Sequence, residues 1–160
     1  MPKNASGKTE IGKKIPDFTA TTTDGGTWRL RDAKGSKVAL FFYPKDMTSG
    51  CTVEAQQFRD LHGAFRKAGT LVIGVSRDSC ASHQKFKTKE KLNYELISDA
   101  DESLCRLFDV IKEKNMYGKK VMGIERSTFL IDEDGTLAQE WRKVKADGHA
   151  ADVLAAAKAL

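Results

Sequence analysis

Hydrophobic and polar positions form blocks along the chain, and the spacing of the apolar residues changes from strand-like to helix-like several times. Residues 37–44, KVALFFYP, and 70–76, TLVIGVS, are nearly continuous apolar runs rich in β-forming residues. Such runs are typical of strands covered on both faces. Between them, Phe58, Leu61 and Phe65 recur at the spacing of one helix face. These blocks predict a strand, a helix of about five turns and a second strand.

The flanking sequence continues this alternation of strands and helices. Residues 18–30 are rich in threonine and are interrupted by Asp-Gly-Gly, which favours a tight turn between two short strands. This pattern predicts an N-terminal β-hairpin. The other expected elements are, in order, a polar helix from about 79 to 91, the strand YELIS, a short helix around 104–111, the strands STFLI and TLAQEWRK joined by DEDG, and a helix from about 150 to 160.

This order of elements predicts a three-layer α/β domain with a central mixed sheet flanked by helices. A thioredoxin-like arrangement fits the order. Because 160 residues suit one hydrophobic core, we expect a single domain over 15–160 after a flexible, polar segment over 1–14. In open sheets, chemistry concentrates where a strand end meets the next helix. The candidate site therefore lies between Tyr43 and Cys51.

Composition narrows the class of protein. Hydrophobic residues make up 40% and charged residues 31% of the chain, as in ordinary soluble domains, and no apolar run is long enough to span a membrane. The N-terminal residues lack the apolar segment of a signal peptide, and three cysteines do not make a disulfide scaffold. We therefore expect a cytoplasmic protein without a membrane partner.

The basic charge does not predict a nucleic-acid partner. The formal net charge is +5, but lysines and arginines are interleaved with acidic residues instead of forming a uniform run. The three histidines, His62, His83 and His149, are far apart and show no ligand spacing. We expect neither a nucleic-acid partner nor a metal.

Cys51 has the most informative sequence context of the three cysteines. It stands in or just before the first turn of the predicted long helix, where unpaired N–H groups and the helix dipole stabilise a thiolate. A helix terminus supplies at most about 2 kcal/mol of such stabilisation. A strongly activated thiolate therefore requires a second positive group, for which arginine is the natural candidate.

The residues around Cys51 carry a family resemblance. Pro44, Thr48 and Cys51 match the Pro-x-x-x-Thr-x-x-Cys motif of peroxiredoxins. The segments FFYPKD and GIERSTFLID resemble the bacterioferritin comigratory protein, or PrxQ, subfamily, and the likeness extends from about Ile15 to the C-terminal helix. The resemblance implies a thiol peroxidase that reduces hydrogen peroxide and organic hydroperoxides through a sulfenic acid at Cys51. It further implies that Arg126 stabilises the thiolate and the transition state.

The remaining roles implied by the resemblance suit the residue types. Thr48 would hydrogen-bond the substrate, because a hydroxyl both donates and accepts, and Pro44 would shield the sulfur from water. Glu54, one turn after Cys51, is either a partner of Arg126 or Arg59 or part of a solvated helix face. The family implies no cofactor, a thioredoxin-type reductant and a monomer.

Recycling of a sulfenic acid requires a thiol. Five residues after Cys51, where many relatives have a resolving cysteine, this chain has Gln56. Other members of the subfamily resolve from a position that aligns with Lys87, whereas this chain has Cys80, seven residues earlier. We therefore hypothesise a Cys51–Cys80 disulfide. An external thiol is the alternative, and Cys105, beside an apolar stripe, is expected to be a core residue.

Two further function classes remain open at this point. A disulfide oxidoreductase is disfavoured because the chain has no Cys-x-x-Cys motif. A non-catalytic thioredoxin-fold holdase or basic binding module would use the positive charge and would not need Cys51. Ser49 replaces the proline that is usual in the family, and the sequence does not fix the effect of this change on the loop.

Overall fold

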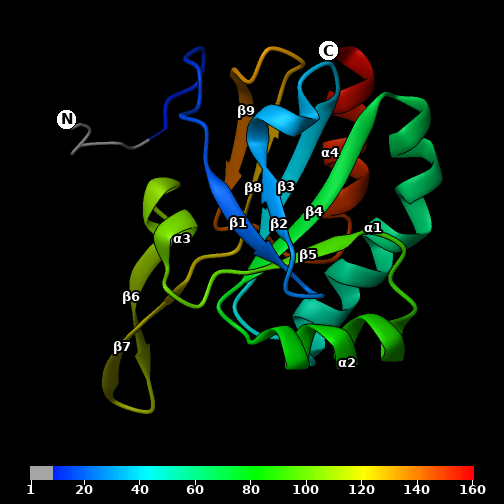
Figure 1. The fold of residues 1–160 in the computed structure, drawn as a ribbon. Coiled ribbons are helices and arrows are strands. Elements are labelled where there is room, and N and C mark those ends of the chain that lie inside the picture. Colours follow the sequence, from blue (N-terminus) through cyan, green and yellow to red (C-terminus); the bar gives the residue numbers. More distant parts are fainter. Residues whose placement is uncertain (1–8) are drawn as a thin grey trace.

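The computed structural model describes residues 9–160, which form strands and helices in alternation (Figure 1). The strands are β1 (Thr19–Thr22), β2 (Thr27–Arg29), β3 (Lys37–Phe42), β4 (Thr70–Ser76), β5 (Glu95–Ser98), β6 (Ile111–Met116), β7 (Lys119–Ile124), β8 (Ser127–Ile131) and β9 (Leu137–Arg142). The helices are the 3₁₀ turn η1 (Leu30–Ala33) and the α-helices α1 (Ser49–Lys67), α2 (Cys80–Glu90), α3 (Ser103–Leu107) and α4 (His149–Ala159).

Within residues 9–160, seven strands form one central sheet in the order β2-β1-β5-β4-β3-β8-β9. The inner strands β3, β4 and β5 run parallel, whereas β1, β2, β8 and β9 join through antiparallel pairs. Helices α1 and α4 lie together on one face of the sheet, and α3 lies on the other (Figure 1). The predicted thioredoxin-like fold with a mixed sheet and an N-terminal hairpin is confirmed.

The central strand β3 separates two hydrophobic cores. Val38, Leu40 and Phe42 point into the core beneath η1 and α3, and Phe41 and Tyr43 point into the core beneath α1, α2 and α4. This division follows from the alternation of side chains along a strand. Burial on both faces is the physical reason for the continuous apolar run that the sequence shows.

The sheet brings the beginning of β8 beside the end of β3. Phe42 pairs with Ser127 in antiparallel register, so Arg126 precedes β8 at the edge where β3 leads into α1. Helix α1 begins at Ser49, earlier than the apolar spacing alone indicates, and its first turn contains Cys51. Topology therefore joins residues 75 positions apart at one end of the sheet.

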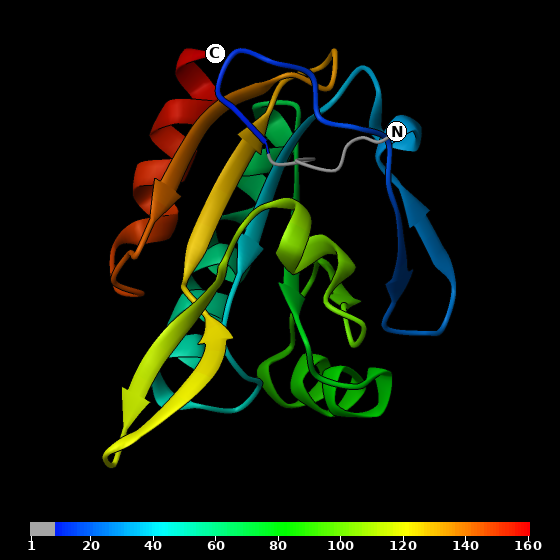
Figure 2. The same ribbon diagram turned by 90° about the vertical axis from the view of Figure 1, so that its left-hand side faces the viewer.

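The hairpin formed by β6 and β7 was not predicted. The short helix expected to reach Ile111 ends at Leu107, and Asp109 adopts a positive φ before β6 begins. Tyr117 and Gly118 both have positive φ, as a two-residue type I′ turn requires. The hairpin extends from the body of the molecule beside the beginning of β8 (Figure 2).

The predicted segment over 1–14 is only partly described, because residues 1–8 lie outside the described residues. Within it, the Gly12 N–H donates to the Leu137 carbonyl at 2.8 Å, and Lys14 forms an isolated bridge with Thr136. The single domain over 15–160 stays a prediction. Over residues 9–160, no helix is both long and apolar enough to cross a membrane.

Candidate active site

Cys51 lies in the first turn of α1 and is 2% exposed. Thr48 is the residue that caps the helix, and the Thr52 N–H is already bonded to the Thr48 carbonyl at 2.9 Å. The N–H groups before Thr52 have no carbonyl one turn earlier in the helix, and they form the positive end of its dipole. The sulfur therefore lies in the environment that the sequence predicted for it.

Arg126 joins Cys51 to Glu54. Its Nη2 donates to the Cys51 Sγ at 3.3 Å, and its Nη1 donates to the Glu54 Oε1 at 2.7 Å. Cys51 and Glu54 are three residues apart in α1, so they share the helix face that meets Arg126. A Cβ atom at Gly50 would lie 3.2 Å from the Nη2 of Arg126, so glycine at this position allows the close approach of the guanidinium.

Glu54 is completely buried, and its two carboxylate oxygens differ. Oε1 accepts from Arg126, whereas Oε2 has no hydrogen-bond partner among the residues that the structure describes. Burial raises the pKa of Glu54 to about 7, against the opposing effect of Arg126. Burial alone would lower the pKa of Arg126, but Glu54 and Cys51 raise it above its ordinary value. Glu54 is thus a partner of Arg126 and does not lie on a solvated face.

Thr48 and Pro44 lie in the segment that connects β3 to Cys51. Thr48 is exposed, and its Oγ1 donates to the Lys45 carbonyl at 2.8 Å. Pro44 is half-buried and follows β3 after one residue. Met47, between them, holds a positive φ of 64°, a conformation that is uncommon for a residue with a side chain. The loop is therefore sharply turned immediately before the Thr48 cap.

The other two cysteines have different environments. Cys80 is the first residue of α2 and is partly buried, and its Sγ donates to the Thr22 carbonyl in β1 at 3.4 Å. Cys105 is fully buried in α3, where burial and then Asp99 raise the pKa of its thiol far above the ordinary range. All three cysteines are free thiols.

A buried polar network ties the loop before Cys51 to the beginning of α2. The Asp46 carboxylate accepts from the Tyr43 hydroxyl at 2.6 Å and from the Ser82 hydroxyl at 2.8 Å, and its Oδ2 lies 2.8 Å from the Nδ1 of His83. The Asp46 N–H donates to the Asp78 Oδ2 at 2.8 Å. Sequence spacing gave no sign of this network, because its members stand on segments that only the sheet brings together.

Asp46, Asp78 and His83 also form a group whose oxygen and nitrogen atoms lie within 4.8 Å of one another, as metal ligands would. Those atoms are already engaged in the hydrogen bonds of the network. The His83 Nε2 lies 2.9 Å from the Ile97 carbonyl, which can only accept, so this nitrogen carries a proton. A metal would have to replace several short hydrogen bonds, and we interpret the group as structural.

Two depressions in the surface differ in their relation to Cys51. An open one of about 570 Å³ adjoins Arg126, and its lining residues come from the β6–β7 hairpin, the beginning of β8 and the segment after β9: Lys112, Glu113, Lys114, Glu125, Arg126, Lys143 and Val144. Its lining contains more basic than acidic side chains. This depression gives solvent access to the guanidinium that contacts the sulfur.

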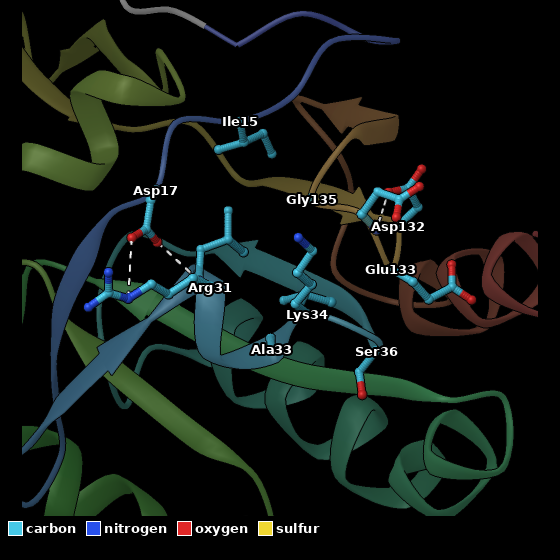
Figure 3. A pocket seen from close by; sticks show the side chains of 12 residues that line it. Ile15, Asp17, Arg31, Ala33, Lys34, Ser36, Asp132, Glu133 and Gly135 are labelled. Carbon is cyan, nitrogen blue, oxygen red and sulfur yellow. Dashed lines mark hydrogen bonds and ion pairs between the residues drawn. The ribbon is translucent and has the colours of Figure 1, made fainter.

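The second depression, of about 150 Å³, lies at the other end of β3 (Figure 3). Ile15, Leu30 and Val38 contribute its apolar surface, and Asp17 pairs with Arg31 at its edge at 3.7 Å. β3 has six residues and so extends about 20 Å between this pocket and the Cys51 end of the strand. The pocket contains none of the predicted site residues.

Comparison with known proteins agrees with this geometry. The AhpC/TSA family matches residues 11–140. Peroxiredoxin Bcp of Xanthomonas campestris is 53% identical over 143 residues, which are 89% of each chain, and Peroxiredoxin Bcp of Bacillus subtilis is 51% identical over 145 residues, 91% of this chain and 92% of that one.

Solved structures give the same relationship. A structure of the Xanthomonas campestris bacterioferritin comigratory protein, described in terms of alkyl peroxide reduction, superposes with a TM-score of 0.85 at 52% identity and covers 89% of this chain and 90% of that one. A Xylella fastidiosa PrxQ variant superposes with a TM-score of 0.90 at 41% identity over 94% of this chain and 96% of that one.

A thioredoxin-like fold with an arginine-bonded cysteine in the first turn of α1 is the arrangement expected of a thiol peroxidase. The chain belongs to the AhpC/TSA family, and it is a peroxiredoxin of the kind represented by Bcp and PrxQ. The resemblance stated from the motif is confirmed, and so is the expected enzyme class, a peroxidase and oxidoreductase.

Proposed function

We propose that Cys51 is the nucleophile that reduces hydrogen peroxide and organic hydroperoxides in this protein. The observation that supports this assignment is the Arg126 Nη2 at 3.3 Å from the Cys51 Sγ, in the first turn of α1. A guanidinium and a helix N-terminus both stabilise a thiolate, which is the reactive form of cysteine. The Xanthomonas relative, which is described as acting on alkyl peroxides, supports the inclusion of organic substrates.

In the proposed reaction, the Cys51 thiolate attacks the terminal oxygen of the peroxide, and the O–O bond breaks. The sulfur loses two electrons and becomes a sulfenic acid, while the other oxygen takes up a proton and leaves as water or an alcohol. Arg126 stabilises the sulfur before attack and the negative charge that develops on the oxygens. We also propose that Thr48 hydrogen-bonds the substrate and that Pro44 shields the sulfur from water.

Substitution of the nucleophile tests this assignment. We expect Cys51→Ser to lose peroxide consumption by at least a hundredfold with a thiol donor, whereas Cys80→Ser keeps the first turnover. Consumption is followed by peroxide assay, and folding is checked by circular dichroism. Full activity in a folded Cys51→Ser protein would contradict the assignment.

We further propose that Cys80 resolves the sulfenic acid by forming a disulfide with Cys51. Cys80 is partly exposed and stands at a helix end, which is easier to release than the buried Cys105. The thiol would have to leave the Thr22 carbonyl, and the first turn of α2 would have to loosen from Asp46. An external thiol acting directly on Cys51 is the competing route.

Peptide mapping after one equivalent of peroxide separates these routes. A peptide that joins Cys51 to Cys80, absent from Cys80→Ser and present in Cys105→Ala, is the expected result. Oxidised Cys51 with free Cys80 and Cys105 in the wild-type protein would reject internal resolution and favour the external thiol.

The reductant, the location and the oligomeric state are proposals that rest on the family. We propose a thioredoxin-type reductant, a cytoplasmic location and a monomer. Turnover with thioredoxin, thioredoxin reductase and NADPH, compared with turnover on glutathione alone, tests the reductant. Light scattering of the reduced and the oxidised protein tests the monomer.

A further inference from the structure

The carboxyl group of Glu54 has one oxygen that the arrangement of the site leaves unused. Oε1 accepts from the Arg126 Nη1 at 2.7 Å, but the buried Oε2 has no hydrogen-bond partner within residues 9–160. A buried anionic oxygen without a donor has lost its hydration and gained nothing in exchange. A proton on Oε2 removes the buried negative charge, which is the larger part of that cost, and leaves the bond from Arg126 to Oε1 intact.

The balance of charges around Arg126 also favours a proton on Glu54. One guanidinium contacts two acidic groups, Cys51 and Glu54, and both are almost fully buried. If both were ionised, these three side chains would carry a net negative charge away from water. If one proton is bound, their charge is zero, which the low polarity of the surroundings favours.

Among the residues that the structure describes, the neighbouring groups do not supply a second balancing charge at hydrogen-bond distance from Glu54. Tyr94 is held neutral, because burial and then Glu54 raise the pKa of its phenol. Burial lowers the pKa of His149 to about 4, so this imidazole is neutral near pH 7. Lys114 is a nearby cation, but its Nζ donates to the Ile124 carbonyl at 2.6 Å, and partial burial followed by Arg126 lowers its pKa. Arg59, which also faces Tyr94, donates to the Glu90 carbonyl at 2.7 Å and pairs with Asp60.

We propose that Cys51 and Glu54 share one proton, which Glu54 holds at Oε2 while Cys51 is a thiolate and gives up when Cys51 becomes a sulfenic acid. This inference rests on the proposed role of Cys51 as the nucleophile. It makes Glu54 the group that balances the proton demand of the oxidation step. The raised pKa of Glu54, about 7, is consistent with a carboxyl group that changes its protonation near neutral pH.

Atoms and charges balance in this scheme. The reactants are the Cys51 thiolate, the peroxide and the protonated Glu54, and the products are the Cys51 sulfenic acid, water or an alcohol, and the Glu54 carboxylate. The sulfur gives two electrons to the O–O bond, and the leaving oxygen gains one proton. After the thiolate charge is lost, Arg126 pairs with Glu54 alone, which favours the ionised carboxylate. The three side chains therefore remain neutral in total before and after the reaction.

Proton counting during a single oxidation tests the proposal. The protein carries Cys80→Ser so that Cys51 stops at the sulfenic acid, and it receives one equivalent of hydrogen peroxide about one pH unit below the pKa of Glu54, where that carboxyl group is mostly protonated, in weak buffer with an indicator dye. Ultraviolet absorbance measures the thiolate before oxidation. The infrared difference between oxidised and reduced protein reports the loss of a protonated carboxyl group. Glu54→Gln is the test variant, and Glu133→Gln, at an exposed position, is the matched control.

We expect the Cys80→Ser protein, which retains Glu54, to show thiolate absorbance and to lose a carboxylic acid band on oxidation. It should take up less than about half a proton for each Cys51 oxidised. Glu54→Gln shows no such band and takes up about one proton, as a free thiolate requires. Glu133→Gln behaves like the protein without a substitution at either glutamate. Uptake of a full proton without a carboxyl band in the protein with Glu54 would overturn the proposal, even if Glu54→Gln did not fold.

Failure of the proposed function gives a different result. If mass spectrometry finds Cys51 unmodified after peroxide treatment, Cys51 is not the nucleophile, and the shared-proton proposal is rejected together with that assignment. Oxidised Cys51 accompanied by a full proton of uptake leaves the nucleophile in place and rejects only the shared proton.

Discussion

Glu54→Gln is expected to change how the stability of the reduced protein depends on pH. The pKa of Glu54 rises from its ordinary value of 4.5 to about 7 in the folded protein, chiefly because the carboxyl group is buried. The folded state therefore binds more protons than the unfolded state between these pH values. The free energy of unfolding must therefore fall as the pH rises from 4.5 to 7. In this interval the carboxyl group of the unfolded chain ionises freely, whereas the buried carboxyl group of the folded chain still holds its proton.

The size of this effect follows from the same two values. Each pH unit between them corresponds to about 1.4 kcal/mol, so the interval from 4.5 to about 7 amounts to about 3 kcal/mol. Glutamine has nearly the same shape, keeps an oxygen for Arg126 and does not titrate. The free energy of unfolding of Glu54→Gln, minus that of the wild type, should therefore increase by about 3 kcal/mol between pH 4 and pH 8.

Urea unfolding of the reduced protein at a series of pH values measures this difference. For a domain of this size, about 3 kcal/mol corresponds to a relative shift of about 1 to 2 M urea in the midpoint. Both proteins carry Cys51→Ser for this measurement, because the thiol is coupled to Glu54 through Arg126, and the remaining titrating groups act alike in both proteins and cancel in the difference. The exposed variant Glu133→Gln should follow the wild type. Parallel curves for Glu54→Gln and the wild type from pH 4 to pH 8 would refute the reasoning.

Three further outcomes are expected. Arg126→Lys should lower the rate of peroxide reduction about 10²- to 10³-fold in stopped-flow assays, because a single ammonium group cannot bond both partners; a rate within threefold of the wild type would contradict this. Gly74→Ala should destabilise the protein by about 1 to 3 kcal/mol, because its Cβ would lie 2.8 Å from the Phe41 ring. Gly63→Ala, on the open surface of α1, should stabilise the protein by about 0.5 to 1 kcal/mol, and urea unfolding measures both changes. His149→Gln should reduce the loss of stability as pH falls from 6.5 to about 4, because burial lowers the pKa of His149 and the unfolded state binds the proton first; an unchanged pH profile would exclude this role.

The parts of the fold that the sequence predicted are those in which apolar spacing and segment length together leave one interpretation. Residues 37–44 are buried on both faces, so their continuous apolar run could only suit an inner strand or a buried helix, and their short length favoured the strand. The β6–β7 hairpin was missed because it extends into solvent with charged side chains on both strands. Its turn at Tyr117 and Gly118 depends on a positive φ at tyrosine, which sequence spacing does not indicate.

The candidate site was predictable to the same limited extent. The position of Cys51 followed from the join between a strand and a helix, and Arg126 followed from the family resemblance, since nothing in its local sequence indicates a catalytic role. Glu54 remained open because helical spacing shows which residues share a face but not which element covers that face. The antiparallel pairing of β8 with β3 decides the matter, because it places Arg126 over Glu54.

Arg126 therefore links the reactivity of the site to the stability of the fold. Its guanidinium is the hydrogen-bonding partner of a buried carboxyl group and of the sulfur at once, so its removal would leave Glu54 buried without its donor. A neutral Glu54 softens that cost, since a protonated carboxyl group tolerates burial better than an anion. Arg126→Met combined with Glu54→Gln should consequently be more stable near pH 8 than Arg126→Met alone, while both stay inactive. Loss of activity without recovery of stability in the double variant would separate the two roles and show that the carboxyl group does not depend on Arg126.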